Sequence, residues 1–460
     1  MKISLQQKAS ILESDLETPV GLFMRLVGEK YGILLESAAV DGTWGRYSII
    51  ATDFLLHINN NDDKLDLDIL DSRFDEMKEL IGLPFVEGLR TLIKTLEIKP
   101  DQEISPQAPI TRALYGYLGY GLVSLFNPKL QTKLPAKDAC LGLALPGTVI
   151  IFDHIYNRIT KLSLLDSKIK LKEASKKHSN IPSNYHNKDT IKEEYINNVI
   201  RAKDLINQGE AVQLVLSAHF QAQLKEDTFT LYRRLRRLNP SPYMFYMNLP
   251  DGTLLGSSPE LMISCDGGNL RLCPIAGTRH RSDDSIEDAL LADELLSDPK
   301  DQAEHVMLVD LGRNDLSEVA EIGSVKLERY MELERFSHVM HLTSRIQAKL
   351  RSDCDAVDVI KATFPAGTVS GAPKQKSFEL IADLEKIPRA AYAGAIGWIG
   401  LDKDAIHLDF GIAIRSLWAN KNKIYWQAGA GIISESKPEA EWQECLNKSK
   451  IMRTILNDVK

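Results

Sequence analysis

The chain has 460 residues, of which 44% are hydrophobic and 26% charged, values typical of a globular protein with one or two domains. Its net charge of -7 disfavours nucleic-acid binding, since nucleic-acid-binding proteins are usually basic. It has no long apolar run and its polar start, MKISLQQKAS, has no signal core, so we expect a cytoplasmic protein without a membrane span. The five cysteines form no CxxC pair, which favours free thiols over a zinc site or a disulfide framework.

The first part of the chain alternates helix and strand signals. Thr18-Pro19 predicts a helix start, because proline fits the first helical turn. The apolar run Tyr31–Ser37 predicts a strand, and the turn Asp41-Gly42 leads to a hairpin partner at Arg46–Ile50. Thr148–Ile159 predicts a further strand.

A polar segment divides the chain. His178–Lys188 carries a proline and has no apolar period, so it is the best linker candidate. We therefore expect an N-terminal region, residues 1–188, and a C-terminal region, residues 189–460. We expect the two regions to interleave in one compact unit.

The C-terminal region opens with a predicted helix, Asp189–Gln208, and a predicted strand, Ala211–Leu216. A second amphipathic helix, Phe229–Leu238, carries a basic cluster that we interpret as a solvated face or a patch for a protein partner. Asn239–Pro242 ends this helix, and Tyr243–Met247 resumes as a strand. The basic cluster consists of Arg233, Arg234, Arg236 and Arg237.

Two carboxylates stand out in the next part of the chain. Gly256–Glu260 predicts a loop that ends in a glutamate. Asp298-Pro299 predicts a helix start, and helical spacing places Glu304 on the same side as Leu308. A carboxylate on a buried face costs free energy unless it is paired or bound to a metal ion.

The stretch Leu401–Lys448 concentrates the strongest site signals. It predicts a strand at Ala405–Trp418, a turn at Ala419–Asn422 and a strand at Lys423–Ile433. Pro438 then predicts the start of an acidic helix.

On that helix Glu441, Glu444 and Lys448 share one face, because they are spaced at i, i+3 and i+7. These side chains, Arg415 on the preceding strand and the glycine-rich end of the second strand would line one pocket. Such a set of groups suits a small anion held together with a hard divalent cation.

Five long motifs make a family resemblance specific. They are PIAGTRHR (Pro274–Arg281), AEHVMLVDLGRNDL (Ala303–Leu316), SHVMHLTSR (Ser337–Arg345), FPAGTVSGAPK (Phe364–Lys374) and QAGAGIISESKPEAEWQECLNK (Gln427–Lys448). In this order they resemble the chorismate-utilising enzymes, and among them the anthranilate synthase component I family, over nearly the whole chain. The resemblance implies an α+β fold whose large mixed sheets pack as a two-subdomain β-sandwich core with helices on the outside.

The resemblance implies a Mg²⁺-dependent lyase. Ammonia would add to ring carbon 2 of chorismate with loss of the 4-hydroxyl, and pyruvate elimination would then give anthranilate, the first step of tryptophan biosynthesis. Glu304 and Glu444 match the carboxylates that hold Mg²⁺, with Asp301 and Glu441 in supporting positions. The positions that match substrate-binding residues are Gly277, Thr278, Tyr392, Arg415, Gly429, Ala430, Gly431 and Lys448.

Three further positions match catalytic roles. We assign Glu260 as the general acid for the departing hydroxyl, a role that requires a raised carboxyl pKa. His341 matches the histidine that assists proton loss from carbon 2, and Thr368 matches a threonine that assists pyruvate release.

Two positions distinguish members of the family. Isochorismate- and salicylate-forming members carry a water-activating lysine where this chain has Gln213. Aminodeoxychorismate synthases often carry a nucleophilic lysine where this chain has Ala276. Both positions favour anthranilate synthase, and aminodeoxychorismate synthase component I, of the folate pathway, remains the alternative. A catalytically silent tryptophan-binding protein is a third hypothesis, disfavoured because the metal carboxylates and His341 are present.

The resemblance also implies regulation and a partner. Two segments, LLES and NPSPYMF, match the tryptophan feedback site, most of which lies in the N-terminal region. The matching residues are Ser37, Pro242, Tyr243 and Met244, with Leu35, Glu36 and Arg46 in support. We find no Cys-His-Glu glutaminase signature, so we expect a separate glutaminase subunit, component II, to supply ammonia in a hetero-oligomer.

Overall fold

The computed structural model describes residues 2–13, 16–38, 45–101, 108–165, 189–335 and 339–456. The predicted linker at 178–188, with the region boundary at 188, lies outside the described residues, as does the predicted turn Asp41-Gly42.

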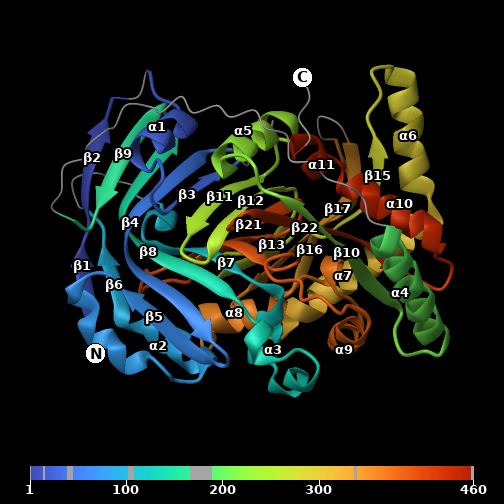
Figure 1. Ribbon diagram of the computed structural model, residues 1–460, viewed down its shortest axis with the longest axis horizontal. Helices are drawn as coiled ribbons and strands as arrows, with labels where there is room; N and C mark the ends of the chain where they lie inside the picture. Colours follow the sequence, from blue (N-terminus) through green and yellow to red (C-terminus); the bar gives the residue numbers. More distant parts are fainter. Residues whose placement is uncertain are drawn as a thin grey trace.

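Most described strands belong to one large, strongly curved sheet whose pairings are all antiparallel (Figure 1). A small second sheet pairs β1 with β6 in parallel. The strands are β1 (Ile3–Gln6), β2 (Lys8–Leu12), β3 (Gly32–Glu36), β4 (Tyr47–Asn61), β5 (Lys64–Ile69), β6 (Leu96–Lys99), β7 (Ala113–Leu118), β8 (Leu141–Asp153), β9 (Arg158–Ser163), β10 (Gln213–Gln223), β11 (Tyr243–Leu249), β12 (Gly252–Ser258), β13 (Leu261–Asp266), β14 (Asn269–Leu272), β15 (Ile275–His280), β16 (Lys326–Arg335), β17 (Val339–Lys349), β18 (Gly371–Ala372), β19 (Ala395–Gly400), β20 (His407–Ile412), β21 (Ser416–Asn420) and β22 (Lys423–Ile432).

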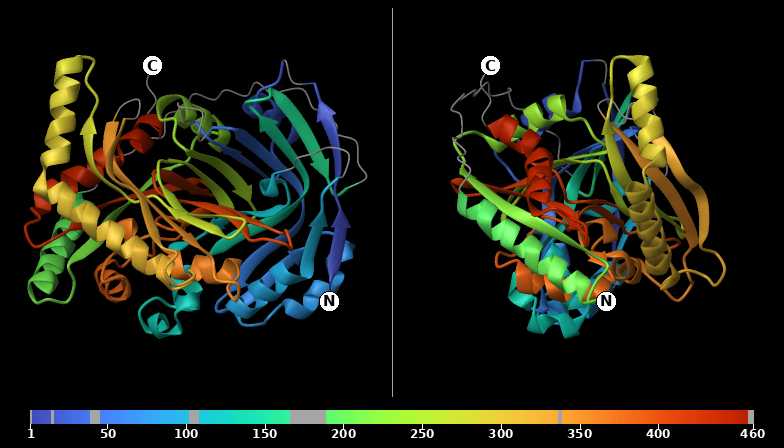
Figure 2. Two further views of the ribbon diagram at one scale, coloured as in Figure 1. Left: turned by 180° about the vertical axis from the view of Figure 1, so that it is seen from behind. Right: turned by 90° about the vertical axis from the view of Figure 1, so that its right-hand side faces the viewer.

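Helices lie outside the strands, with α1, α5 and α11 toward one side and α2, α3, α8 and α9 toward the opposite side (Figures 1 and 2). The helices are α1 (Pro19–Leu26), α2 (Phe85–Thr95), α3 (Val123–Phe126), α4 (Asp189–Asn207), α5 (Thr228–Leu238), α6 (Ser285–Ser297), α7 (Pro299–Ser317), α8 (Ala356–Thr363), α9 (Lys374–Leu384), α10 (Pro438–Lys448) and α11 (Lys450–Leu456). The expected α+β architecture with large sheets and outer helices is confirmed.

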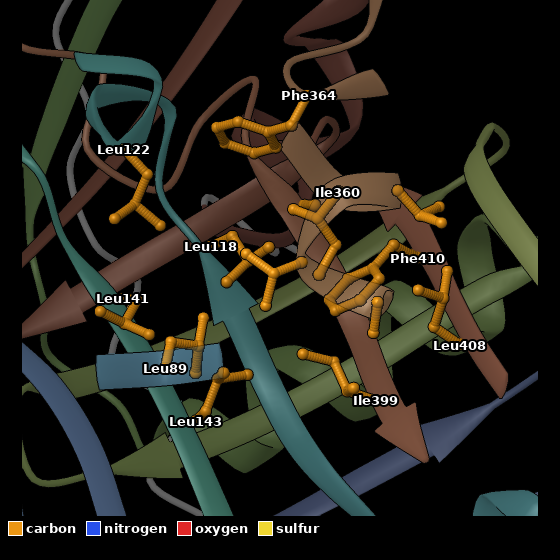
Figure 3. Close-up of a cluster of buried hydrophobic side chains, with 14 of the residues drawn as sticks. Leu89, Leu118, Leu122, Leu141, Leu143, Ile360, Phe364, Ile399, Leu408 and Phe410 are labelled. Carbon is orange, nitrogen blue, oxygen red and sulfur yellow. The ribbon is translucent and has the colours of Figure 1, made fainter. Parts of the chain in front are cut away.

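Strands of the two regions pair with each other, and the two regions share a core. β3 pairs with β11, and β7 pairs with β19, so the N-terminal and C-terminal strands join into the large sheet at two places. Figure 3 shows Leu89, Leu118 and Leu141 packed with Ile360 and Phe410 in one buried cluster. This shared apolar core therefore stabilises the contact between the regions.

Several local predictions are confirmed. α1 begins at Pro19, and the Thr18 side chain caps it by accepting a hydrogen bond from the Gly21 amide. β3 and β4 form the predicted antiparallel pair. α4, α5, α7 and α10 all lie where helical spacing and proline predict them.

The predicted strand Thr148–Ile159 is wrong as one element. β8 ends at Asp153 and β9 begins at Arg158, and the two strands pair as a hairpin. Its turn contains Asn157 at φ 45°, a left-handed conformation that asparagine tolerates better than most residues.

The predicted strand Ala405–Trp418 is also wrong as one element. β20 ends at Ile412 and β21 begins at Ser416, because β20 pairs with β19 and β13 whereas β21 pairs with β12 and β22. At this change of neighbours Arg415 adopts φ 49°. Left-handed backbone is unfavourable for arginine, so the surroundings must hold it there.

The predicted loop Gly256–Glu260 is wrong in its first part. Gly256–Ser258 belongs to β12, which pairs with β11 and β21, and only Pro259 and Glu260 lie between β12 and β13. The alternation of small residues here fits a central strand buried on both faces.

The interpretation of the basic cluster on α5 as a solvated face is wrong for two of its arginines. Arg234 forms an ion pair of 3.0 Å with Glu226, and Arg236 binds Glu36 through both carboxylate oxygens. Both glutamates are buried, and a buried carboxylate requires a partner, which the helical spacing alone does not reveal.

Among the helices in the described part of the chain, none combines the length and apolar character needed to cross a membrane.

Candidate active site

The sequence-predicted site residues come from strands and helices that meet in the C-terminal half of the sheet (Figure 1). α10 packs on β22, and α7 packs on β15 and β17. In this region the Glu444 side chain is 46% exposed to solvent, whereas Glu260 and His341 are buried.

The solvent side of the site carries the candidate metal ligands. The Lys448 ammonium contacts Glu444 at 2.6 Å and donates to the Gly429 carbonyl at 3.0 Å. Burial alone would lower the pKa of Lys448. The negative charges of Glu444 and Glu304 outweigh this effect and raise the pKa above its usual value. Both carboxylates therefore act on the same ammonium group, although they come from helices far apart in sequence.

Glu304 is oriented by a side chain from the neighbouring strand. The Gln213 amide donates to Glu304 Oε1 at 3.0 Å, and Gln213 is buried on β10. A β-carbon on Gly431 would lie 2.5 Å from Gln213 Nε2 and 3.5 Å from Glu304 Oε1. The missing side chain of Gly431 thus makes the space that this pair occupies.

The carboxylates fit a hard cation. Glu304 and Glu444 are acidic oxygen donors placed around one positive charge, and Mg²⁺ prefers one or two carboxylates completed by water and ligand oxygens. Within the described residues, no group of three or more His, Cys, Asp or Glu side chains is arranged to hold a metal ion. A cation here would therefore need further ligands from water or substrate.

The two supporting carboxylates differ. Glu441 is buried, and burial followed by repulsion from Glu444 raises its pKa, so it lies close to the metal candidates. Asp301 forms an ion pair of 3.0 Å with Arg279 and lies beside Gly277. It is therefore engaged by an arginine, a contact that its position in the sequence does not indicate.

Gly429, Ala430 and Gly431 lie inside β22, paired with β10. Because side chains alternate along a strand, Gly429 and Gly431 face the same side, on which Tyr392 and Glu304 lie. A β-carbon on Gly429 would lie 3.1 Å from the Tyr392 hydroxyl. The phenol therefore lies directly over a strand segment without side chains.

His341 is prepared as a base. Its Nδ1 donates to the Gly277 carbonyl at 3.0 Å and lies 3.0 Å from Thr278 Oγ1. A carbonyl only accepts, so Nδ1 carries the proton and the neutral ring keeps its lone pair on Nε2. Burial, together with the positive charge of Arg415, lowers the pKa of His341, so the ring is neutral at neutral pH. Gly277 permits this contact because it adopts φ 66°.

Glu260 is prepared as an acid. It is 8% exposed, and burial raises its pKa to about 7, against smaller opposing effects of Thr368, Lys448 and Arg415. The Thr368 hydroxyl is buried near this carboxyl and makes no hydrogen bond of normal geometry within the described residues. Both groups are thus available to a bound molecule.

Arg415 lies near both the candidate acid and the candidate base. Its charge affects the pKa of Glu260 and of His341, and burial lowers its own pKa. A guanidinium in this position can bind a carboxylate through two parallel hydrogen bonds.

The sequence did not reveal every residue that builds the site. Arg389 is buried behind Tyr392, paired with Glu385 at 2.7 Å, and donates to the carbonyls of Val369 and Val215. A cavity of about 250 Å³ opens here, lined by Arg389, Tyr392 and residues of β21 and β22. Glu385 lies only four residues before Arg389, but the two carbonyls that Arg389 binds belong to other segments, and this part of its role has no local signal.

The predicted regulatory residues also meet. β3 pairs with β11, which places Glu36 opposite Met244. The Ser37 hydroxyl is buried and has no hydrogen-bond partner among the described residues, so it can bind a ligand. Glu36 is fixed by Arg236 and by the Tyr232 hydroxyl at 2.7 Å.

The other predicted regulatory residues have structural partners. The Tyr243 hydroxyl donates to Asp409 at 2.8 Å, and its ring lies over Gly411. Pro242 precedes it and is half-buried, as is Leu35 on β3. Arg46 pairs with Asp153 at 2.9 Å, a contact on the β4–β8 side of the sheet.

Comparisons with known proteins identify the class. The chain matches the family of chorismate binding enzymes over residues 70–454. Because this match covers most of the chain, the protein belongs to the chorismate binding enzyme family.

Its relatives are more specific. The chain is 37% identical to anthranilate synthase component 1 of Aquifex aeolicus, over 96% of this chain and 92% of that protein. It is also 37% identical to anthranilate synthase component 1 of Methanothermobacter marburgensis, over 95% of this chain and 92% of that protein. The chain is thus a chorismate-utilising protein of the anthranilate synthase component I type.

Solved structures agree. Anthranilate synthase component I from Streptococcus pneumoniae matches with a TM-score of 0.72 and 30% identity, covering 96% of this chain and 99% of that one. The menaquinone-specific isochorismate synthase MenF from Escherichia coli matches with a TM-score of 0.73 and 19% identity, covering 99% and 95%. The second likeness shows a shared fold.

Proposed function

We propose that the chain is the large subunit of a Mg²⁺-dependent anthranilate synthase, which converts chorismate and ammonia to anthranilate, pyruvate and water. The single observation that carries this proposal is that an acid and a base near Arg415 have pKa values shifted in opposite directions. Glu260 has a pKa of about 7, and the neutral His341 holds its lone pair on Nε2.

Glu304 and Glu444 would hold the metal ion on the solvent side of the site, where 46% of the Glu444 side chain is exposed. Bound there, Mg²⁺ would supply positive charge that binds the ring carboxylate of chorismate. The second carboxylate of the substrate, on the enolpyruvyl group, suits Arg415 and the Tyr392 hydroxyl.

The first chemical step replaces a hydroxyl by an amine. Ammonia forms a bond to carbon 2, the ring double bonds shift, and the bond from carbon 4 to its hydroxyl breaks. The protonated Glu260 donates its proton to the departing oxygen, which leaves as water.

The second step restores aromaticity. His341 Nε2 accepts the proton from carbon 2, and the bond from the ring to the enolpyruvyl oxygen breaks, so that the enolate of pyruvate leaves and takes up a proton to become pyruvate. The buried Thr368 hydroxyl is suited to hydrogen-bond the departing oxygen.

Two residues favour ammonia over the other nucleophiles. Gln213 donates to Glu304, so no lysine base stands in this position to activate water. Ala276 on β15 offers no amine to attack the ring. Ammonia itself would come from a separate glutaminase subunit, and L-tryptophan would inhibit by binding at Ser37 and Met244.

The decisive experiment is the product formed from chorismate, an ammonium salt and Mg²⁺. We expect fluorescent anthranilate together with pyruvate. A product that keeps the enolpyruvyl group would instead identify aminodeoxychorismate synthase, and a hydroxylated product would identify an isochorismate synthase. Tryptophan binding without any turnover of chorismate would refute the enzymatic proposal.

A further inference from the structure

A buried cluster of polar side chains connects the two candidate sites. The Asn239 amide donates to Ser257 Oγ at 2.8 Å, and the Ser257 hydroxyl lies 2.9 Å from Ser241 Oγ. The Ser257 hydroxyl also contacts the Asn239 carbonyl. Ser257 is fully buried and Ser241 is 5% exposed, so these contacts are shielded from water.

One end of this cluster touches the regulatory strand. The Ala38 amide donates to the Ser241 carbonyl at 3.2 Å, directly after Ser37. Ser241 also precedes Pro242 and therefore belongs to the same turn as the predicted regulatory residues. A ligand that contacts Ser37 would thus also affect the position of the 239–242 turn.

The other end touches the active site. The Ser257 amide donates to the Arg415 carbonyl at 3.1 Å, directly after the β12–β21 pairing of Gly256 with Ser416. Arg415 is in a left-handed conformation, and this hydrogen bond fixes one of the two peptide units that flank it. A shift of β12 at Ser257 would therefore turn the arginine that binds the substrate carboxylate.

We propose that Ser257 is a positioning residue that links the 239–242 turn to Arg415, so that occupation of the Ser37 cleft changes the affinity for chorismate. This inference rests on the proposed function, and it adds the route by which the cleft acts on the active site. The hydroxyl of Ser257 binds the turn while its amide binds Arg415, so one residue joins both ends.

The test is a thermodynamic cycle. The dissociation constant of L-tryptophan and the KM for chorismate are measured, the latter with and without saturating tryptophan, for wild type and Ser257→Ala. The ratio of the two KM values is the coupling, which typically lies between about 5 and 150 in allosteric proteins. We expect Ser257→Ala to reduce this ratio at least about fivefold, as for the loss of a buried hydrogen bond, while tryptophan alone binds within about twofold of wild type.

Thr253→Ala is the matched control. It removes a hydroxyl from the same strand, bonded to Asn248 at 3.1 Å, without touching the 239–242 turn or Arg415. Its coupling ratio should equal that of wild type. Ser241→Ala removes the neighbouring hydroxyl of the cluster and provides a second variant if Ser257→Ala does not fold.

Three results would overturn the proposal. They are an unchanged coupling ratio in both serine variants, a loss of tryptophan binding itself in Ser257→Ala, and a wild-type enzyme whose KM does not respond to tryptophan. In the third case anthranilate formation by wild type would still support the catalytic proposal, whereas absence of anthranilate would refute that proposal instead.

Discussion

Glu260 and Glu36 are both glutamates buried in the sheet, yet their surroundings differ. Glu36 is 6% exposed and accepts hydrogen bonds from Arg236 and Tyr232 that satisfy both carboxylate oxygens. Glu260 is 8% exposed and forms no ion pair within the described residues, and burial raises its pKa to about 7 although Lys448 and Arg415 act in the opposite direction. A carboxylate whose two oxygens are both hydrogen-bonded stabilises the fold, whereas a carboxylate without a counter-ion can still accept and donate a proton.

The same contrast separates the two sites. At the predicted regulatory site Glu36 is held by Arg236 and Tyr232, while the Ser37 hydroxyl has no hydrogen-bond partner among the described residues. The candidate active site brings together a proposed acid, a proposed base and the two carboxylates proposed to bind Mg²⁺. Four variants test this contrast, and we take them from the largest expected effect to the smallest.

The first variant is Glu304→Gln. It removes one carboxylate charge but keeps the shape and a possible contact with Gln213, so the fold should remain. We expect Mg²⁺-dependent turnover to fall about a thousandfold, as for the loss of a principal electrostatic contact. Steady-state kinetics across a Mg²⁺ titration would measure this, and normal activity would remove the metal assignment.

The second variant is Glu260→Gln. An amide cannot donate the proton that Glu260 supplies, so we expect turnover to fall between about a hundredfold and ten thousandfold. The pKa of Glu260 lies above its ordinary value of 4.5, so its acid form persists to about pH 7 and is lost above it. In wild type, kcat/KM at constant free ammonia should therefore decline as the pH rises through about 7. A profile that stays flat there would contradict the role of Glu260.

The third variant is Arg236→Ala, which leaves Glu36 buried with only Tyr232 as a partner. Breaking a buried pair costs about 3–5 kcal/mol, and we expect about 2 kcal/mol here because 42% of the arginine side chain is exposed. Urea denaturation of both proteins measures the difference. Arg237→Ala, an exposed neighbour on the same helix, should change stability by less than about 0.5 kcal/mol.

The fourth variant is Ser37→Ala. It removes the hydroxyl that would bind the amino acid, so the inhibition constant for tryptophan should rise about tenfold with turnover largely kept. Inhibition curves at fixed chorismate measure the change, and Ser37→Phe should relieve inhibition further by filling the cleft. A superimposable curve in both variants would count against the regulatory site.

Much of this arrangement follows from short-range sequence patterns. Proline positions and helical spacing predicted the starts of α7 and α10 and the shared face of Glu441, Glu444 and Lys448. Motif order predicted which residues meet, because an ordered set of long motifs carries information about the whole fold.

The sequence could not predict features that arise where distant segments meet. The break at Arg415 arises because the chain changes partner strands, and no local signal marks it. The pairing of Arg236 with Glu36 joins residues 200 positions apart, so the arginine cluster resembled a solvated surface. The role assigned to Glu260 from the motif required a raised pKa, but the burial that raises it is visible only in the folded chain.

Gly429 limits how this active site could have diversified during evolution. A β-carbon there would lie 2.5 Å from the main-chain oxygen of Leu216, which cannot move aside without breaking the pairing of β10 with β22. Substitutions that change the ligand specificity of the site are therefore restricted to other positions around it, where side chains already exist and can be exchanged. New specificities would arise by altering what surrounds this strand, while the strand itself stays unchanged.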